Sequence, residues 1–414
     1  MKLKGAVAIV VAALLVVGCG KEKDKQDIPK PFNSPLSSVD KRLVEASNAF
    51  GFRMLQDISK SKPETNRFVS PISISTALAL VYNGAAGESK EAMGKAMGIN
   101  EFKLDDLNNG YRDLIHRLRR SDDGGNELSV ANSLWMREGK TFHDSFVQRA
   151  KDNYNAEATE LDFKSPNAVQ KMNEWVEQHT NGKITDIVKD IDAEAMLFVV
   201  NAVYFQGAWS EPFQPGITKK ADFYSAKDQS FSVDMMARGG HFEYFANSDY
   251  EAIKLPFGKD ESAFMTVFLP SERTGLSQLQ EKLARDPKLV SMPFEVRQGS
   301  IELPKVKFEY QIELNDALKS LGMEEAFDQT HGNFSLMAPE PPNLYIGSVK
   351  HKTFLDMNEQ GTVAAAATVV EMLAGAAQPE DPFRMTVNRP FLLTITDKET
   401  GCILFIGTVT DPTG

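Results

Sequence analysis

The chain has 414 residues, of which 42% are hydrophobic and 25% are charged, the ordinary balance of a soluble globular protein. Its 57 Asp and Glu residues outnumber 46 Lys and Arg residues, which leaves a formal net charge of -11. Because nucleic-acid binding depends on neutralising phosphates with basic side chains, this charge argues against a general nucleic-acid-binding protein. A local basic patch remains compatible with it.

The first residues are typical of a secreted protein. Lys2 and Lys4 flank the start of an apolar run, residues 6–17, which matches the core of a signal peptide and is too short for a comfortable membrane span. Gly18 and Cys19 follow, and they resemble a bacterial lipoprotein box. The resemblance implies cleavage before Cys19 and lipidation of its thiol and new amino terminus. The alternative is a plain signal peptide that happens to contain a cysteine.

The sequence therefore predicts a signal peptide at 1–18, a flexible tether at 19–38 and one large domain at 39–414. The tether is charged, rich in Pro and Ser, and without hydrophobic periodicity. Secretion across the inner membrane would leave the protein lipid-anchored in the cell envelope. Gly20 favours the outer membrane or cell surface if the cell is Gram-negative.

The remaining cysteine, Cys402, has no disulfide partner if Cys19 is acylated. It lies in the apolar run "GCILFIG", so we expect a buried and inert thiol.

Helical patterns lie mostly in the first half of the chain, and strand patterns follow between and after them. Ser70 and Pro71 form an N-cap and first-turn proline, and Gly182 marks a C-cap. Helices are predicted over 39–58, 70–85 and 165–184, and strands over 127–137, 195–209, 263–270, 299–314 and 388–409. The order is mixed rather than regularly alternating, which favours an α+β fold over a doubly wound parallel sheet.

Enzyme motifs are missing from the sequence. There is no G-x-S-x-G nucleophile elbow, HExxH zinc motif, Walker loop or dinucleotide fingerprint. The six histidines are scattered, so no metal cluster of usual spacing is predicted, and we expect no cofactor. A Ser-His-Asp triad built from distant positions stays compatible with the sequence, but we expect a protein that is not an enzyme.

Residues 359–382 combine conflicting propensities. Ala364 to Ala367 favour a helix, whereas the flanking Val and Thr residues favour a strand. A Pro- and acid-rich cluster then closes the segment. Local propensity alone leaves a linker, a poor helix and a strand as alternatives.

A series of motifs in order resembles the serpin family over residues 39–414. They include "NRFVSPISISTALALVYNGAAGES", "ANSLWM", "VNAVYFQGAW", "LPKVKFE", "HKTFLDMNEQGTVAAAAT" and "MTVNRPFLLTI". The resemblance implies an α+β serpin fold with three β-sheets, about nine helices and an exposed reactive-centre loop at about 359–383, in a single metastable domain. It also implies suicide inhibition of serine, and sometimes cysteine, proteases by a monomer. A cleaved loop would insert into the central sheet and trap the acyl-enzyme.

The hinge of this loop has a composition that suits insertion. Side chains of a strand alternate between faces, so Thr362, Ala364, Ala366, Thr368 and Val370 would share one face. This face carries no charge, as burial requires. Glu359 and Gly361 begin the hinge, and glycine gives it backbone freedom. The alternative is a non-inhibitory serpin that binds a ligand or acts as a scaffold in the envelope.

By family spacing, the bait bond lies about sixteen residues after Glu359, at Gly375–Ala376. Leu373, Ala374 and Ala377 remain alternatives. These small residues indicate elastase-like or subtilisin-like targets, and Leu373 leaves a papain-like target open. The absence of Lys and Arg from 360–383 argues against a trypsin-like target.

The resemblance also assigns two groups of switch residues. Ser70, Ser73, Asn201 and His351 match the shutter beneath the central strands. Trp209, Lys305 and Glu359 match the breach, where the loop first inserts, and we expect an ion pair between the last two. Read without the family, Ser70 is a helix cap and His351 a buried core histidine.

One helical face is basic. Arg112, His116, Arg119 and Arg120 lie near one face of a helix and resemble in position the heparin-binding helix of antithrombin. A polyanion site is one interpretation. A solvated face neutralised by Asp113, Asp122 and Asp123 is the other.

Overall fold

The computed structural model describes residues 35–119, 126–192, 195–339, 344–362 and 381–413. Its α-helices are α1 (Ser38–Ser61), α2 (Pro71–Tyr82), α3 (Gly87–Met97), α4 (Leu104–Leu118), α5 (Asp144–Tyr154), α6 (Ala168–His179), α7 (Leu276–Arg285) and α8 (Asn315–Leu318). Residues 19–34 of the tether (Cys19 among them), most of the reactive-centre loop and the expected bait residues lie outside these ranges. The last tether residues are described, and Ser37 and Ser38 cap and begin α1. In the described part, no helix is long and apolar enough to cross a bilayer.

Fifteen strands are described. They are β1 (Arg67–Val69), β2 (Glu127–Arg137), β3 (Glu157–Leu161), β4 (Leu197–Ala208), β5 (Lys219–Tyr224), β6 (Ser230–Ala246), β7 (Tyr250–Phe257), β8 (Ala263–Pro270), β9 (Glu295–Pro304), β10 (Val306–Glu313), β11 (Val349–Asn358), β12 (Gly361–Thr362), β13 (Phe383–Thr386), β14 (Phe391–Asp397) and β15 (Ile403–Val409). All five predicted strand regions contain strands, and α1, α2 and α6 match the predicted helices.

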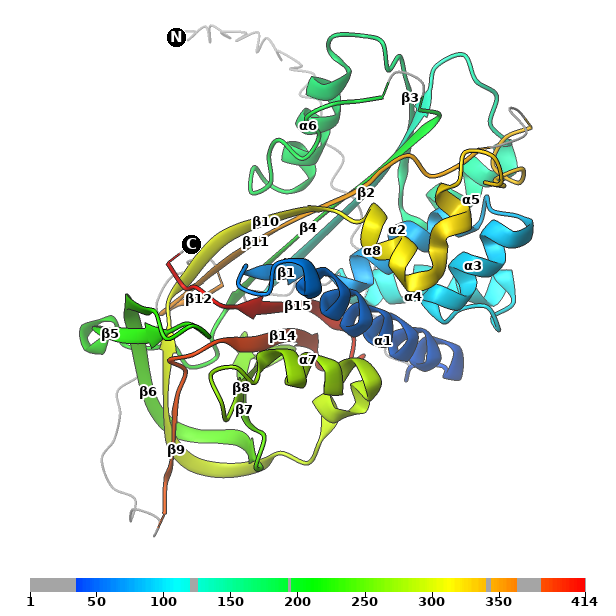
Figure 1. Ribbon diagram of the computed structural model, residues 1–414. Helices are drawn as coiled ribbons and strands as arrows, with labels where there is room; N and C mark the ends of the chain where they lie inside the picture. Colours follow the sequence, from blue (N-terminus) through cyan, green and yellow to red (C-terminus); the bar gives the residue numbers. More distant parts are fainter. Residues whose placement is uncertain (1–34, 120–125, 193–194, 340–343, 363–380, 414) are drawn as a thin grey trace, which may run out of the picture. The chain divides into compact units, whose positions relative to one another are not determined.

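The strands form two hydrogen-bonded sheets. The central sheet has the order β10-β11-β12-β4-β2-β3, and its long strands run side by side in Figure 1. The other sheet has nine strands, because the long strand β6 pairs with β5, β7 and β9. The resemblance implies three sheets, but the described residues form two, because β6 joins two of the expected sheets into one.

Both faces of the central sheet are buried along most of β4. Along β4, Val199, Val203 and Phe205 belong to the main hydrophobic core, whereas Val200 and Tyr204 belong to a second cluster with α6. The alternation follows from the two-residue period of a strand. A segment inserted beside the middle of β4 would therefore meet apolar side chains on both faces, whereas Gln206, near the end that pairs with β12, is partly exposed.

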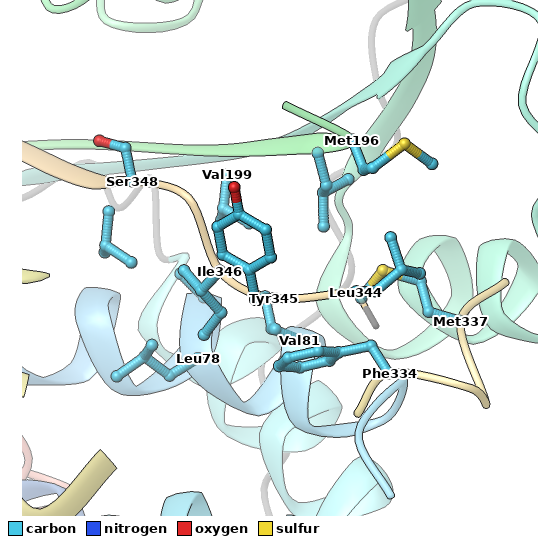
Figure 2. A pocket seen from close by; sticks show the side chains of 13 residues that line it. Leu78, Val81, Met196, Val199, Phe334, Met337, Leu344, Tyr345, Ile346 and Ser348 are labelled. Carbon is cyan, nitrogen blue, oxygen red and sulfur yellow. The ribbon is translucent and has the colours of Figure 1, made fainter. Parts of the chain in front are cut away.

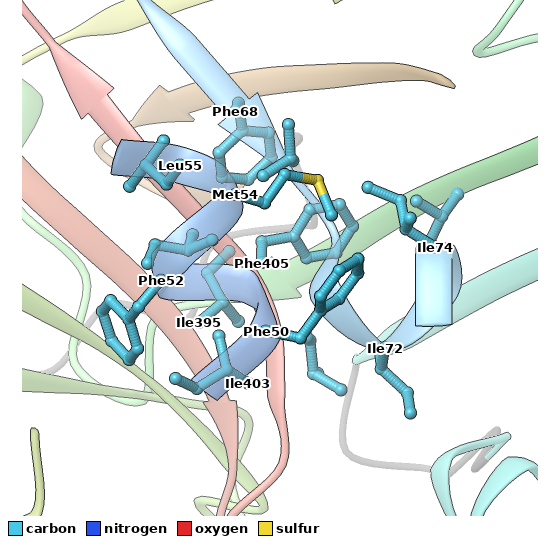
Figure 3. Packing of buried hydrophobic residues seen from close by; sticks show 14 of the residues in the cluster. Phe50, Phe52, Met54, Leu55, Phe68, Ile72, Ile74, Ile395, Ile403 and Phe405 are labelled. Carbon is cyan, nitrogen blue, oxygen red and sulfur yellow. The ribbon is translucent and has the colours of Figure 1, made fainter. Parts of the chain in front are cut away.

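The main core joins α1, β1 and α2 to the strands β14 and β15. Figure 3 shows Phe50, Met54, Phe68 and Phe405 packed there, with the rings of Phe68 and Phe405 stacked at 4.7 Å between centroids. Cys402 is fully buried in this core and is a free thiol, as expected. Burial raises the pKa of the thiol, so it stays protonated and unreactive at neutral pH.

Candidate functional site: the breach and shutter of the central sheet

The short strand β12 is wedged between β11 and β4 at one end of the central sheet. Gly361 pairs with Asn358 on β11 and Ala208 on β4, and Thr362 pairs with Met357 and Gly207. At the other end the two flanking strands pair directly, from Val349–Val199 to Lys352–Ala202. The sheet therefore holds the first hinge residues at one end of the slot between β11 and β4, while the other end, from Val349 to Lys352, is closed by direct pairing.

Gly361 fits this position because it has no side chain. Its φ of +142° lies outside the range that L-residues adopt easily, and an added Cβ would collide with the carbonyl oxygen of Gly207. Glycine is therefore required at position 361 for two reasons: its backbone conformation, and the lack of space for a Cβ beside β4.

Thr362 is 2% exposed and points into the sheet interior. Its hydroxyl accepts a hydrogen bond of 3.0 Å from the backbone N–H of Gly207. This orientation agrees with the face predicted for the inserting set. The other members, Ala364, Ala366, Thr368 and Val370, lie outside the described residues, as do Leu373, Ala374, Gly375, Ala376 and Ala377.

Trp209 fastens the turn that joins β11 to β12. Its indole N–H donates to the carbonyl of Asn358 at 2.9 Å, and its backbone N–H donates to the carbonyl of Gln360 at 2.9 Å. The ring stacks on Phe257 with centroids 4.4 Å apart. The Trp209 side chain therefore connects the hinge, through a hydrogen bond, with the core, through ring stacking.

The expected ion pair of the breach is present. Lys305 Nζ lies 2.9 Å from Glu359 Oε2, and the Thr218 hydroxyl donates to the other carboxylate oxygen at 2.9 Å. Burial alone raises the pKa of Glu359, but the hydrogen bonds from Lys305, a backbone N–H and Thr218 outweigh it, and the net pKa is below its usual value. Thr218 was not identified from the sequence, since it lies 141 positions from its partner.

The shutter is a row of polar residues across three neighbouring strands. Asn132 on β2 is opposite Asn201 on β4, which is opposite His351 on β11. Asn201 Nδ2 donates to Asn132 Oδ1 at 2.7 Å, and Asn201 Oδ1 accepts from the Ser73 hydroxyl at 2.7 Å. Asn132 is a member of this row that sequence reasoning missed, although "ANSLWM" contains it.

His351 is fully buried and linked to the start of α2. Its Nε2 accepts a 3.1 Å hydrogen bond from the backbone N–H of Ser70, so Nδ1 carries the proton and donates to Asn201 Oδ1 at 3.2 Å. Burial lowers the pKa of His351 to about 3, which keeps the ring neutral. Ser70 also accepts from the Ser73 N–H, so it caps α2 as well as joining the shutter.

Comparisons with known proteins agree with this geometry. The family model for serpins, serine protease inhibitors, matches residues 45–412. The chain belongs to the serpin family. An uncharacterized serpin-like protein of Methanosarcina acetivorans is 33% identical, covering 99% of each chain. Serpin-ZX of Arabidopsis thaliana is 31% identical, covering 86% of this chain and 94% of its own.

Solved serpin structures have the same fold. The thermophilic serpin tengpin in its native state superposes with a TM-score of 0.83 at 29% identity, covering 91% of this chain and 97% of its own. Because serpins are mostly protease inhibitors rather than enzymes, the general expectation of an inhibitor is supported.

The prediction that the basic residues of α4 share one exposed face is wrong. Arg112 is exposed and pairs with Asp113 at 3.2 Å, but the Arg119 guanidinium turns inward and donates to the carbonyl of Val130 at 3.1 Å. His116 is half-buried, and Arg120 lies outside the described residues. Arg119 ends the helix, where its chain can reach a neighbouring strand, so helical spacing did not predict its direction.

Proposed function

We propose that this serpin is a suicide-substrate inhibitor of serine proteases, with cysteine proteases as a second class of target. The observation that carries the proposal is the placement of β12 between β11 and β4, with Thr362 buried on the inner face. The hinge has already begun a strand in the slot that cleavage would let it complete. Completion adds main-chain hydrogen bonds on both sides of the new strand.

The register of β12 with β4 and β11 can be extended through the slot without conflict. Six residues after Thr362 is Thr368, six residues before Gly207 is Asn201, and six residues before Met357 is His351. An inserted strand in this register therefore brings Thr368 between Asn201 and His351. Its hydroxyl would replace the hydrogen bond that now joins those two side chains. Ala364 and Ala366 would precede it with little volume to accommodate.

The test is a single substitution in the hinge. Thr362→Arg should turn the inhibitor into a substrate, because an unpaired buried charge opposes strand insertion. Formation of an SDS-stable complex with an elastase-like protease is the measurement. Val363→Arg is the matched control, because the register of β12, extended by one residue, would set Val363 level with Gln206 and Asp356, which are both partly exposed. Trapping by Thr362→Arg that equals wild type would refute the insertion mechanism.

We propose Gly375–Ala376 as the bait bond, with Leu373, Ala374 and Ala377 as alternative sites at or near the cut. Small side chains suit the shallow specificity pockets of elastase-like and subtilisin-like enzymes. Mass spectrometry of the released C-terminal peptide, after incubation with a protease panel, identifies the bond. Absence of a covalent complex with every elastase-like or subtilisin-like enzyme would contradict this choice of target. If loop cleavage also left thermal stability unchanged, a non-inhibitory envelope protein would be the better reading.

We also propose that Cys19 is lipidated and that the tether at 19–38 links the serpin to the cell envelope. The sequence around Gly18 and Cys19 supports the proposal. Multiple acyl chains give stable membrane anchoring. Cys19→Ser should move the protein from the membrane fraction to the soluble fraction, and an unchanged distribution would contradict the anchor.

A further inference from the structure

The segment between β4 and β5, residues 209–218, holds the turn that precedes β12. Trp209 donates two hydrogen bonds to this turn, and the Thr218 hydroxyl donates a third to the Glu359 carboxylate. The backbone N–H of Phe213 donates a fourth, to the Glu359 carbonyl at 2.9 Å. We call residues 209–218 the clasp, because these bonds fix the chain just before β12.

Arg238 on β6 fastens the clasp to the nine-stranded sheet. Its guanidinium donates to the backbone carbonyl of Glu211 and lies 3.2 Å from the Glu211 carboxylate. The same cation lies over two rings, with Cζ 5.5 Å from the centroid of Phe213 and 4.8 Å from that of Phe242. Arg238 therefore contacts the clasp through a carbonyl, a carboxylate and an aromatic ring.

These contacts are made by a buried charge. The Arg238 side chain is 12% exposed, whereas that of Glu211 is 68% exposed. Burial lowers the pKa of the guanidinium, an effect that Glu211 opposes, and Nε is buried without a hydrogen-bond partner among the described residues. Because burying an incompletely paired charge costs free energy, an apolar side chain in its place need not destabilise the fold. The effect of Arg238 on the clasp can therefore be separated by experiment from its effect on stability.

The geometry of the slot favours insertion that starts beside the clasp. At that end β12 already lies between β4 and β11. At the other end Val199 is paired with Val349, and Figure 2 shows Val199 among side chains of α2 and of the segment before β11, including Leu78 and Ile346. A new strand would therefore extend from β12 towards the two valines.

We propose that Arg238 is a positioning residue for loop insertion, an inference that rests on the proposed inhibitory function. By fastening the clasp, Arg238 keeps Gly361 and Thr362 in register between β4 and β11, so the new strand has a formed nucleus when the loop is cut. The rate of insertion is proportional to the fraction of molecules in which this nucleus is formed. A loosened clasp lowers that fraction and gives the protease more time to complete hydrolysis and leave.

The first arm of the test uses the intact, uncleaved protein and no protease. Arg238→Met removes the charge and its donors but keeps an apolar side chain against Phe242. Amide exchange at Phe213 should accelerate about tenfold, the loss expected for one hydrogen bond to a charged group. Arg238→Lys, which keeps a cation over the rings and beside Glu211, should restore much of the protection.

Arg117→Met is the matched control. Arg117 on α4 is also buried and lies 2.7 Å from one glutamate, Glu399, but it belongs to neither the clasp nor the hinge. Exchange at Phe213 should be unchanged in this variant. If Arg117→Met lowers the melting temperature as much as Arg238→Met and Phe213 stays protected, instability alone does not loosen the clasp. Equal protection of Phe213 in wild type and Arg238→Met would overturn the inference.

The second arm measures how the cleaved loop partitions between insertion and hydrolysis. With an elastase-like protease, Arg238→Met should raise the number of inhibitor molecules consumed per protease trapped severalfold. The rate of loop cleavage should stay the same, because cleavage precedes insertion. Arg238→Lys should return the number towards the wild-type value, and Arg117→Met should not change it.

The two arms separate the possible failures. Faster exchange at Phe213 with an unchanged number of inhibitor molecules consumed would show that the clasp does not control insertion, and would overturn the role of Arg238. If the wild type traps no protease, the proposed function fails and the role in insertion fails with it. Exchange at Phe213 then still decides whether Arg238 fastens the clasp.

Discussion

Gly361 is the hinge position where an added side chain would collide with the neighbouring strand. Gly361→Ala should expel β12 from the sheet, because the methyl group would overlap the backbone of β4 at Gly207. The backbone N–H of Trp209 and the N–H of Gly207 would then lose their acceptors on the hinge. Hydrogen exchange of these two amides should accelerate in the uncleaved protein.

Gly347→Ala is the control for this prediction. A Cβ at Gly347 meets no atom within 4 Å, so the substitution should leave exchange at the breach unchanged. Equal protection of the two amides in wild type and Gly361→Ala would show that the sheet tolerates a side chain at the hinge.

His351 should make stability depend on pH. Its folded pKa of about 3 lies below the ordinary 6.5, so the unfolded chain binds the proton first as the pH falls. The contribution is complete above about pH 6.5 and declines towards pH 3, by up to about 1.4 kcal/mol per pH unit. Protonation would place an N–H where Nε2 now accepts from Ser70.

Denaturant unfolding of wild type and His351→Gln at pH 6.5 and pH 5 measures this term. The wild type should lose up to about 2 kcal/mol more than the variant over this interval. Parallel pH profiles of the two proteins would show that the shutter histidine does not carry the dependence.

At the scale of secondary-structure elements, we expect the turn between β11 and β12 to depend on the ion pair of Lys305 and Glu359. The Lys305 side chain is 39% exposed and that of Glu359 is 11% exposed, so solvent screens the interaction. A double-mutant cycle with Lys305→Met and Glu359→Gln should give a coupling energy of about 0.5–1 kcal/mol. Each single substitution should also increase amide exchange at Trp209.

The cycle has a matched control in the exposed helical pair Glu91 and Lys95 on α3. Glu91→Gln and Lys95→Met remove a pair of the same chemistry and should leave exchange at Trp209 unchanged. If the breach cycle shows no coupling, the pair does not hold the turn, which then depends on its other hydrogen bonds, from Trp209, Phe213 and Thr218.

For the whole molecule, the proposed function requires a native state that is less stable than the loop-cleaved state. An added strand of about ten residues makes main-chain hydrogen bonds on both sides, which stabilises the cleaved form by on the order of 10 kcal/mol. Cutting the loop with a protease that escapes trapping should therefore raise the melting temperature markedly. Thr362→Arg should show a much smaller rise, and equal melting temperatures before and after wild-type cleavage would exclude metastability.

The fold and the identity of many switch residues could be predicted because they depend on short stretches of sequence. Helix caps such as Ser70, the strand patterns and the small uncharged hinge are local, and their order along the chain is enough to indicate the family. The orientation of Arg119 could not be predicted, because its partner at Val130 belongs to a different element.

The sequence by itself determined the family resemblance, the α+β class and a hinge whose alternate residues tolerate burial. Only the tertiary structure decided which groups meet, such as Asn132 beside Asn201 and Thr218 on Glu359. The physical reason is that propensity and periodicity act over a few residues, whereas strand register and side-chain hydrogen bonds join positions far apart in the chain. Gly361 belongs to both levels, since its backbone freedom is local but the atom that excludes a side chain lies on β4.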